Sequence, residues 1–154
     1  MALKEAVELA KKGLSYAKRT KYKEALAYYN KALTLDPNYA EGLFLRAAAL
    51  IESGKYKEGL VDCDKANAIN QNLSEAWSKK SLALFYLERI EDALAASTRA
   101  STLNANDVTA WYIRGVCLDE MGRSDEAQEA YGRSLELEII LDMHAEARRM
   151  KKQW

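Results

Sequence analysis

Apolar and small residues recur along this chain at intervals of three and four, the spacing of an amphipathic helix. Over residues 6–39 they form two stripes, and Thr20 and Lys21 separate them. The first stripe comprises Val7, Leu9, Ala10, Gly13, Leu14, Tyr16 and Ala17, and the second comprises Tyr22, Ala25, Leu26, Tyr29, Ala32, Leu33 and Leu35. Pro37 follows the second stripe, and proline cannot continue a helix interior. The pattern therefore predicts a helical hairpin.

The same pattern returns along the chain at a fixed interval. Asn38, Asn72 and Asn106 mark a period of 34 residues. Other columns agree with it, among them Leu9, Leu43, Trp77 and Trp111, and also Ala25, Gly59, Ala93 and Ala127. The units run over 6–39, 40–73, 74–107 and 108–138. A period of this length predicts stacked repeats, which present extended surfaces to partners and rarely build active sites.

Several positions carry specific local predictions. Asn38 and Asn72 each precede a glutamate by three residues, which predicts capping boxes at the starts of the next helices. Thr109 stands three residues after Asn106, which makes this a weaker form of the same capping motif. Gly59 stands in a helix interior, where glycine costs roughly 1 kcal/mol against alanine, so the second helix of repeat two is expected to be the softest.

With these columns in place, the chain resembles the tetratricopeptide repeat family over about residues 4–137. The matching residues are Leu9, Gly13, Tyr16, Ala25, Tyr29, Ala32 and Pro37 in repeat one, and Trp111, Gly115, Leu118, Gly122, Ala127 and Tyr131 in repeat four. Gln71 and Ala105 depart from the pattern, because they replace its proline. The resemblance implies a single all-α domain over 1–154, a right-handed α-solenoid of four helix-turn-helix hairpins with a C-terminal helix.

The tail continues the helical pattern after the fourth repeat. Repeat four lacks an Asp-Pro-Asn exit, and a stripe follows at Tyr131, Leu135, Ile139, Met143, Ala147, Met150 and Trp154. One interpretation is an unbroken helix from Ser124 to Trp154, about 46 Å long. The other is a kink near Glu138, with a separate capping helix over 138–154. An uncovered apolar stripe would make the tail an association site.

The resemblance also implies which side chains point into the concave face, which the first helices of the repeats line. The candidate partner-binding residues at these positions are Lys11, Leu14, Lys18, Phe44, Leu45, Ile51, Lys79, Leu82, Phe85, Tyr86, Tyr112, Ile113 and Val116. Most are apolar, which is typical of a binding groove. The alternative is that some of them pack between helices.

One subfamily, the co-chaperones, grips acidic chaperone tails with a lysine-, asparagine- and arginine-based clamp. The matching positions here are Ala10, Leu14, Leu45, Glu75 and Lys79, and only Lys79 keeps the charge. Because a carboxylate needs charge-assisted donors, the sequence argues against this clamp.

Composition narrows the function further. Lys plus Arg and Asp plus Glu each total 23, so the formal net charge is zero and neither nucleic acid nor a membrane surface is an expected partner. Asp62 and Asp64 are expected to be solvated. Cys63 and Cys117 lack metal-like spacing and predict free thiols in the cytoplasm, and His144 is the only histidine.

These observations favour a protein with no catalytic residues, no cofactor and no metal. The leading hypothesis is a non-enzymatic adaptor that binds a peptide or an amphipathic helix of another protein in its groove. The alternatives are a homo-oligomer joined through the C-terminal helix or the groove, and a co-chaperone-like domain that binds heat-shock chaperone tails.

Overall fold

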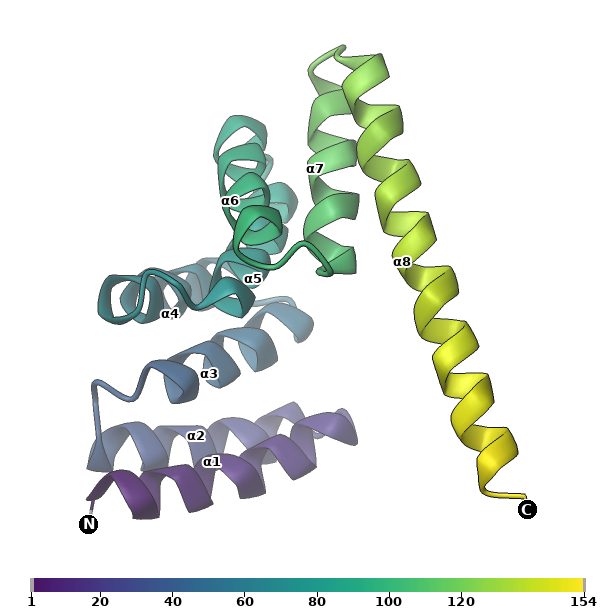
Figure 1. Ribbon diagram of the computed structural model, residues 1–154. Helices are drawn as coiled ribbons and strands as arrows, with labels where there is room; N and C mark the ends of the chain where they lie inside the picture. The colour runs from purple at the N-terminus through teal and green to yellow at the C-terminus, as the bar shows by residue number, and fades with distance from the viewer. Residues whose placement is uncertain (1, 154) are drawn as a thin grey trace.

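The computed structural model describes residues 2–153, which form eight helices and no strand. The helices are α1 Ala2–Lys18, α2 Tyr22–Leu35, α3 Ala40–Glu52, α4 Tyr56–Ile69, α5 Ser74–Tyr86, α6 Ile90–Leu103, α7 Val108–Glu120 and α8 Ser124–Lys151. Figure 1 shows four hairpins stacked in chain order, from α1 and α2 to α7 and α8, each turned relative to the one before. The chain is therefore an all-α solenoid, as the repeat pattern predicts.

The helix contacts show which face of the solenoid is concave. Each odd-numbered helix packs on the next odd-numbered helix, in addition to packing on its neighbours in the chain. Within residues 2–153 the even-numbered helices do not contact one another. The odd-numbered helices therefore lie on the inside of the curve, and α1, α3, α5 and α7 line the concave face.

Small residues allow the two helices of each hairpin to approach closely. A methyl group added at Gly13 would lie 2.6 Å from Cε1 of Tyr29, and one at Gly115 would lie 2.7 Å from Cδ1 of Tyr131. A methyl group at Gly59 would meet Cγ1 of Ile51 at 2.5 Å. The soft helix expected at Gly59 stays a prediction, and the structure adds that the missing side chain lets α4 lie against α3.

The turn inside each hairpin uses the left-handed backbone region at one fixed position. Thr20, Gly54, Glu88 and Gly122 occupy it, with φ values of 59°, 89°, 61° and 76°. Two of these residues are glycines, which adopt positive φ without a steric penalty. Thr20 and Glu88 bear a side chain there, and β-branched Thr20 is the more strained of the two.

The turns between repeats correct the predicted capping boxes. No side chain caps α3 or α5, whose N-cap residues are Tyr39 and Leu73. The backbone N–H of Asn72 instead donates to Oδ1 of Asn70 at 3.0 Å, and Asn38 and Asn106 form the same turn with Asp36 and Asn104. The asparagine column thus belongs to the turn rather than to the cap. Among α2 to α8, only α7 has a side-chain N-cap, in which Oδ1 of Asp107 accepts from the N–H of Ala110.

Two tryptophans tie down the turns that lack proline. Nε1 of Trp77 donates to the carbonyl oxygen of Gln71 at 2.9 Å, and Nε1 of Trp111 donates to that of Ala105 at 2.8 Å. Gln71 and Ala105 are the residues that stand in the proline column. The indole therefore fixes a turn that Pro37 fixes covalently in repeat one.

The last helix runs without a break from Ser124 to Lys151. Its 28 residues span roughly 42 Å, and no kink occurs at 136–140. Oγ of Ser134 donates to the carbonyl oxygen of Val108 at 3.2 Å, so α7 begins opposite Ser134. Beyond this point α8 continues past the N-terminal end of α7 (Figure 1). Trp154, the last residue of the predicted stripe, lies outside the described residues.

Gly59 and Gly132 form a matched pair for testing the close approach of helices. Gly59→Ala should lower the free energy of unfolding by about 1–2 kcal/mol, because overpacking against Ile51 exceeds the gain in helix propensity. Gly132→Ala should raise it by up to ~1 kcal/mol, since nothing lies within 4 Å of the added methyl group. Urea denaturation measures both. Equal stabilisation by the two changes would contradict the close approach of α4 to α3.

Candidate concave interface

The predicted groove residues fall into three groups by exposure. Lys11, Lys18, Tyr86 and Tyr112 are exposed, whereas Leu14, Phe44, Leu45, Lys79, Leu82, Phe85 and Val116 are half-buried and Ile51 and Ile113 are buried. Four of the half-buried apolar side chains also pack on core clusters, namely Phe44, Leu45, Leu82 and Phe85. They form a floor whose outer surface remains accessible.

Ile51 and Ile113 do not line an accessible groove, and this corrects the prediction for both. Each is only 2% exposed. Ile51 lies in a core cluster with Cys63 and Ala83, and Ile113 in one with Leu84. The reason is that neighbouring helices converge on these positions, as α4 does where Gly59 faces Ile51. Both isoleucines hold repeats together.

Two tyrosines stand out from the concave positions because each side chain is 53% exposed. The Tyr86 ring stacks on the ring of Tyr56 at 4.7 Å between centroids and meets Phe85 edge-on at 5.7 Å. Tyr112 lies 6.0 Å from Tyr131. Neighbouring rings therefore fix both side chains while half of each stays open to a partner. Tyr56 and Tyr131 come from second helices, and the sequence did not assign them to this surface.

Charge is distributed unevenly along the concave face. Lys79 is engaged already, because its Nζ lies 3.2 Å from Oε1 of Glu52 on the neighbouring α3. Lys11 and Lys18 are exposed at the repeat-one end, where Lys11 makes only a surface pair with Glu8 at 3.3 Å. Asp119 and Glu120 are exposed on α7 at the opposite end. The groove is thus basic at its first repeat and acidic at its last.

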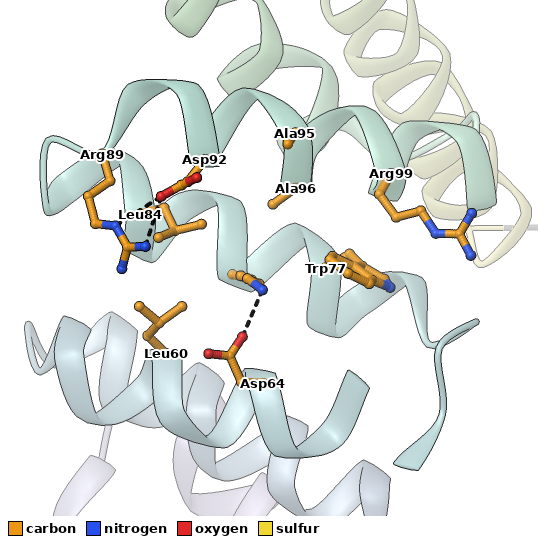
Figure 2. A pocket seen from close by; sticks show the side chains of 10 residues that line it. Leu60, Asp64, Trp77, Leu84, Arg89, Asp92, Ala95, Ala96 and Arg99 are labelled. Atoms are coloured by element: carbon orange, nitrogen blue, oxygen red, sulfur yellow. Dashed lines mark hydrogen bonds and ion pairs between the residues drawn. The ribbon is translucent and has the colours of Figure 1, made fainter. Parts of the chain in front are cut away.

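A separate pocket lies where α4, α5 and α6 meet (Figure 2). Leu60, Trp77 and Leu84 supply its apolar lining. Its charges are mostly paired, since Lys80 lies 2.8 Å from Asp64 and Arg89 lies 2.8 Å from Asp92. Asp64 is exposed, as the sequence predicts. Both carboxylates that line the pocket are therefore paired with cations that also line it.

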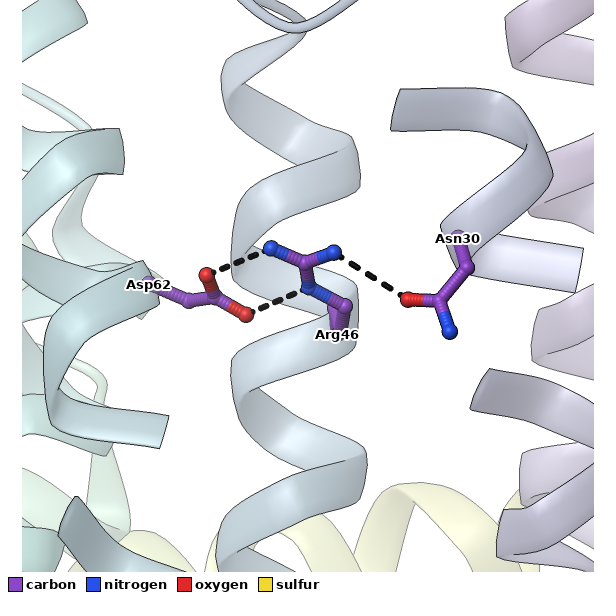
Figure 3. A network of polar contacts seen from close by, with 3 residues as sticks. All are labelled: Asn30, Arg46 and Asp62. Atoms are coloured by element: carbon purple, nitrogen blue, oxygen red, sulfur yellow. Dashed lines mark hydrogen bonds and ion pairs between the residues drawn. The ribbon is translucent and has the colours of Figure 1, made fainter. Parts of the chain in front are cut away.

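Asp62, in contrast, is buried, which contradicts the prediction that it is solvated. Figure 3 shows Arg46 of α3 between Asp62 of α4 and Asn30 of α2. Nε and Nη2 of Arg46 donate to the two carboxylate oxygens of Asp62 at 2.7 and 2.8 Å, and Nη1 donates to Oδ1 of Asn30 at 3.1 Å. The hydrogen bonds to Asp62 raise the pKa of Arg46, and the charge of Asp62 adds to this against the opposite effect of burial. One guanidinium therefore joins repeats one and two.

The cysteines and the histidine do not form a reactive site. Burial, aided by nearby acidic groups, raises the pKa of Cys63 to about 12 and that of Cys117 to about 11, which keeps both thiols protonated. His144 is exposed on α8. Residues 2–153 contain no group of three His, Cys, Asp or Glu side chains placed to hold a metal ion. In the same range, no helix is long and apolar enough to cross a membrane.

Comparison with known families agrees with the repeat geometry. A TPR repeat model matches residues 13–54, and a tetratricopeptide repeat model matches residues 79–135. The chain belongs to the tetratricopeptide repeat (TPR) family. No curated protein sequence matches it.

Solved TPR structures share the fold. MamA superposes with a TM-score of 0.78 at 20% identity, over 90% of this chain and 81% of MamA. The first TPR of Spaghetti (RPAP3), bound to the HSP90 peptide SRMEEVD, has a TM-score of 0.75 at 28% identity, over 78% of this chain and 95% of that one. The Arabidopsis OM64 TPR domain has a TM-score of 0.75 at 23% identity, over 78% of this chain and 99% of that domain. TPR domains as a class bind other proteins, so the concave face is the candidate interface.

The ion pairs of Asp62 and Asp64, one with a buried and one with an exposed carboxylate, allow a test of the buried pair. Arg46→Ala should lower the free energy of unfolding by about 3 kcal/mol, because it leaves the Asp62 carboxylate buried without a partner. Asp64→Ala, which removes an exposed pair with Lys80, should cost less than about 1 kcal/mol. Thermal and urea unfolding measure both. Equal costs would show that the Arg46 bridge contributes no more than a surface pair.

Proposed function

We propose that this TPR domain is a non-enzymatic adaptor whose concave groove binds a helical or extended apolar segment of another protein. The main support is the pair of tyrosines at concave positions, Tyr86 and Tyr112, each 53% exposed. Tyrosine offers a large amphipathic contact area at a low cost in side-chain entropy. The two buried, protonated thiols support a reducing, cytoplasmic setting for this activity.

The groove also indicates the character of the segment it binds. Half-buried Leu82, Phe85 and Val116 form an apolar floor, which fits the apolar face of an amphipathic helix. Lys11 and Lys18 at one end and Asp119 and Glu120 at the other favour a segment with opposite charges at its two ends. Such a segment would lie with its acidic end toward repeat one.

The peptide-bound RPAP3 domain suggests a second candidate, an acidic chaperone tail. The clamp positions of this chain do not favour it. Ala10 is buried, half-buried Leu14 and Leu45 offer no donor, and Glu75 would repel a carboxylate. Lys79 retains its charge but is paired with Glu52. An apolar segment is therefore the better match.

Replacing both exposed tyrosines tests the proposed groove. Peptides selected from a display library on the immobilised domain should bind Tyr86→Glu/Tyr112→Glu at least about tenfold more weakly, since exposed aromatic anchors dominate such interfaces. Fluorescence anisotropy measures the affinity, and circular dichroism checks the fold. Val61→Glu is the control, because Val61 is equally exposed but lies on α4. Unchanged affinity in the folded double variant would refute the groove as the binding site.

The peptide SRMEEVD, bound in the RPAP3 structure, tests the clamp directly. We expect any Kd in calorimetry to lie above about 100 μM, because a carboxylate lacks the charge-assisted donors it needs here. Binding at low micromolar Kd would favour the chaperone-tail alternative.

A further inference from the structure

The C-terminal part of α8 has no helix beneath it. α7 begins at Val108, opposite Ser134, and Leu137 is the last buried residue of α8. α7 is the only helix that α8 contacts among those described. We name residues 138–151 the overhang, and Figure 1 shows it extending past the end of α7. All of its side chains are exposed except half-buried Ala145.

The overhang carries an apolar stripe with the spacing of a coiled-coil seam. Ile140, Met143, Ala147 and Met150 follow one another at intervals of three, four and three residues, with Ile139 alongside. The large side chains of this group are 46–64% exposed. Single exposed apolar residues are ordinary, but a contiguous stripe of this kind on a helix marks an association surface.

Charge along the end of α8 is divided by sign. Acidic residues occupy Glu136, Glu138, Asp142 and Glu146, and basic residues occupy Arg148, Arg149, Lys151 and Lys152. Two copies aligned in parallel would bring acid to acid and base to base. Two copies aligned antiparallel would bring the acidic half of each against the basic half of the other, which is favourable. Two copies of this segment are therefore complementary in charge only when they lie antiparallel.

We propose that the overhang pairs with the overhang of a second copy of this chain as an antiparallel two-helix interface. In this pairing Ile140 lies opposite Met150 of the second copy, and Met143 lies opposite Ala147. The pairing is isologous, so it closes as a dimer and does not propagate. The pairing uses residues of the overhang only, whereas the concave groove residues lie on α1, α3, α5 and α7.

Sedimentation equilibrium of the full chain tests the proposal. At about 100 μM the wild type should be a dimer, since a seam of this kind supports a Kd in the micromolar range. Ile140→Glu/Met143→Glu should raise the Kd at least about tenfold. Met121→Glu should leave it unchanged, because Met121 is an exposed apolar residue that lies outside the overhang.

Charge reversal tests the orientation of the two helices. Glu138→Lys/Asp142→Lys should weaken the dimer, because the new lysines would lie opposite Lys152 and Arg148 of the second copy. Adding Arg148→Glu and Lys152→Glu to the same chain should restore it, because each new lysine then lies opposite a new glutamate of the second copy. A monomeric wild type, open-ended oligomers, a dimer that survives Ile140→Glu/Met143→Glu, or failure of the restored variant would each overturn the proposal.

Discussion

The two helices of each hairpin approach closely where one of them carries glycine, alanine or serine. The rest of the structure depends on this close approach. The ring of Tyr29 packs on Gly13, and the ring of Tyr131 packs on Gly115. The side chain of Ile51 packs on Gly59. Larger side chains there would separate the helices and alter the angle at which the next repeat stacks. Because each repeat contacts only its neighbours, a change of angle would propagate along the solenoid. The shape of the concave face is therefore set at buried positions between the helices of each hairpin.

The structure offers two candidate interaction surfaces, the concave face and the overhang, and they differ in character. The concave face combines a half-buried apolar floor with two exposed tyrosines and opposite charges at its ends. The overhang is a single helix with a narrow apolar seam and a charge pattern complementary to itself. The first suits a segment of another protein and the second suits another copy of the chain. One chain can use both at once because they lie on different elements.

Much of this could be predicted from the 34-residue period, which locates both helices of every hairpin and the small-residue columns. What the sequence could not provide were partners that lie far apart in the chain. The sequence predicts that Asp62 is exposed, because it does not show that Arg46, on another helix, binds the Asp62 carboxylate. The sequence predicts that Ile51 and Ile113 line the groove, because a helical stripe does not show where a third helix packs on the first two. The asparagine column signals a repeat correctly, but residues two positions earlier take part in the turn that it marks.

The central claim is that a partner segment is held by the first helices of the repeats. Backbone hydrogen–deuterium exchange of the domain, free and saturated with a selected peptide, tests it most directly. Protection should increase in α1, α3, α5 and α7, where the concave residues lie. An increase confined to α4 and α6, or to the overhang, would contradict the claim.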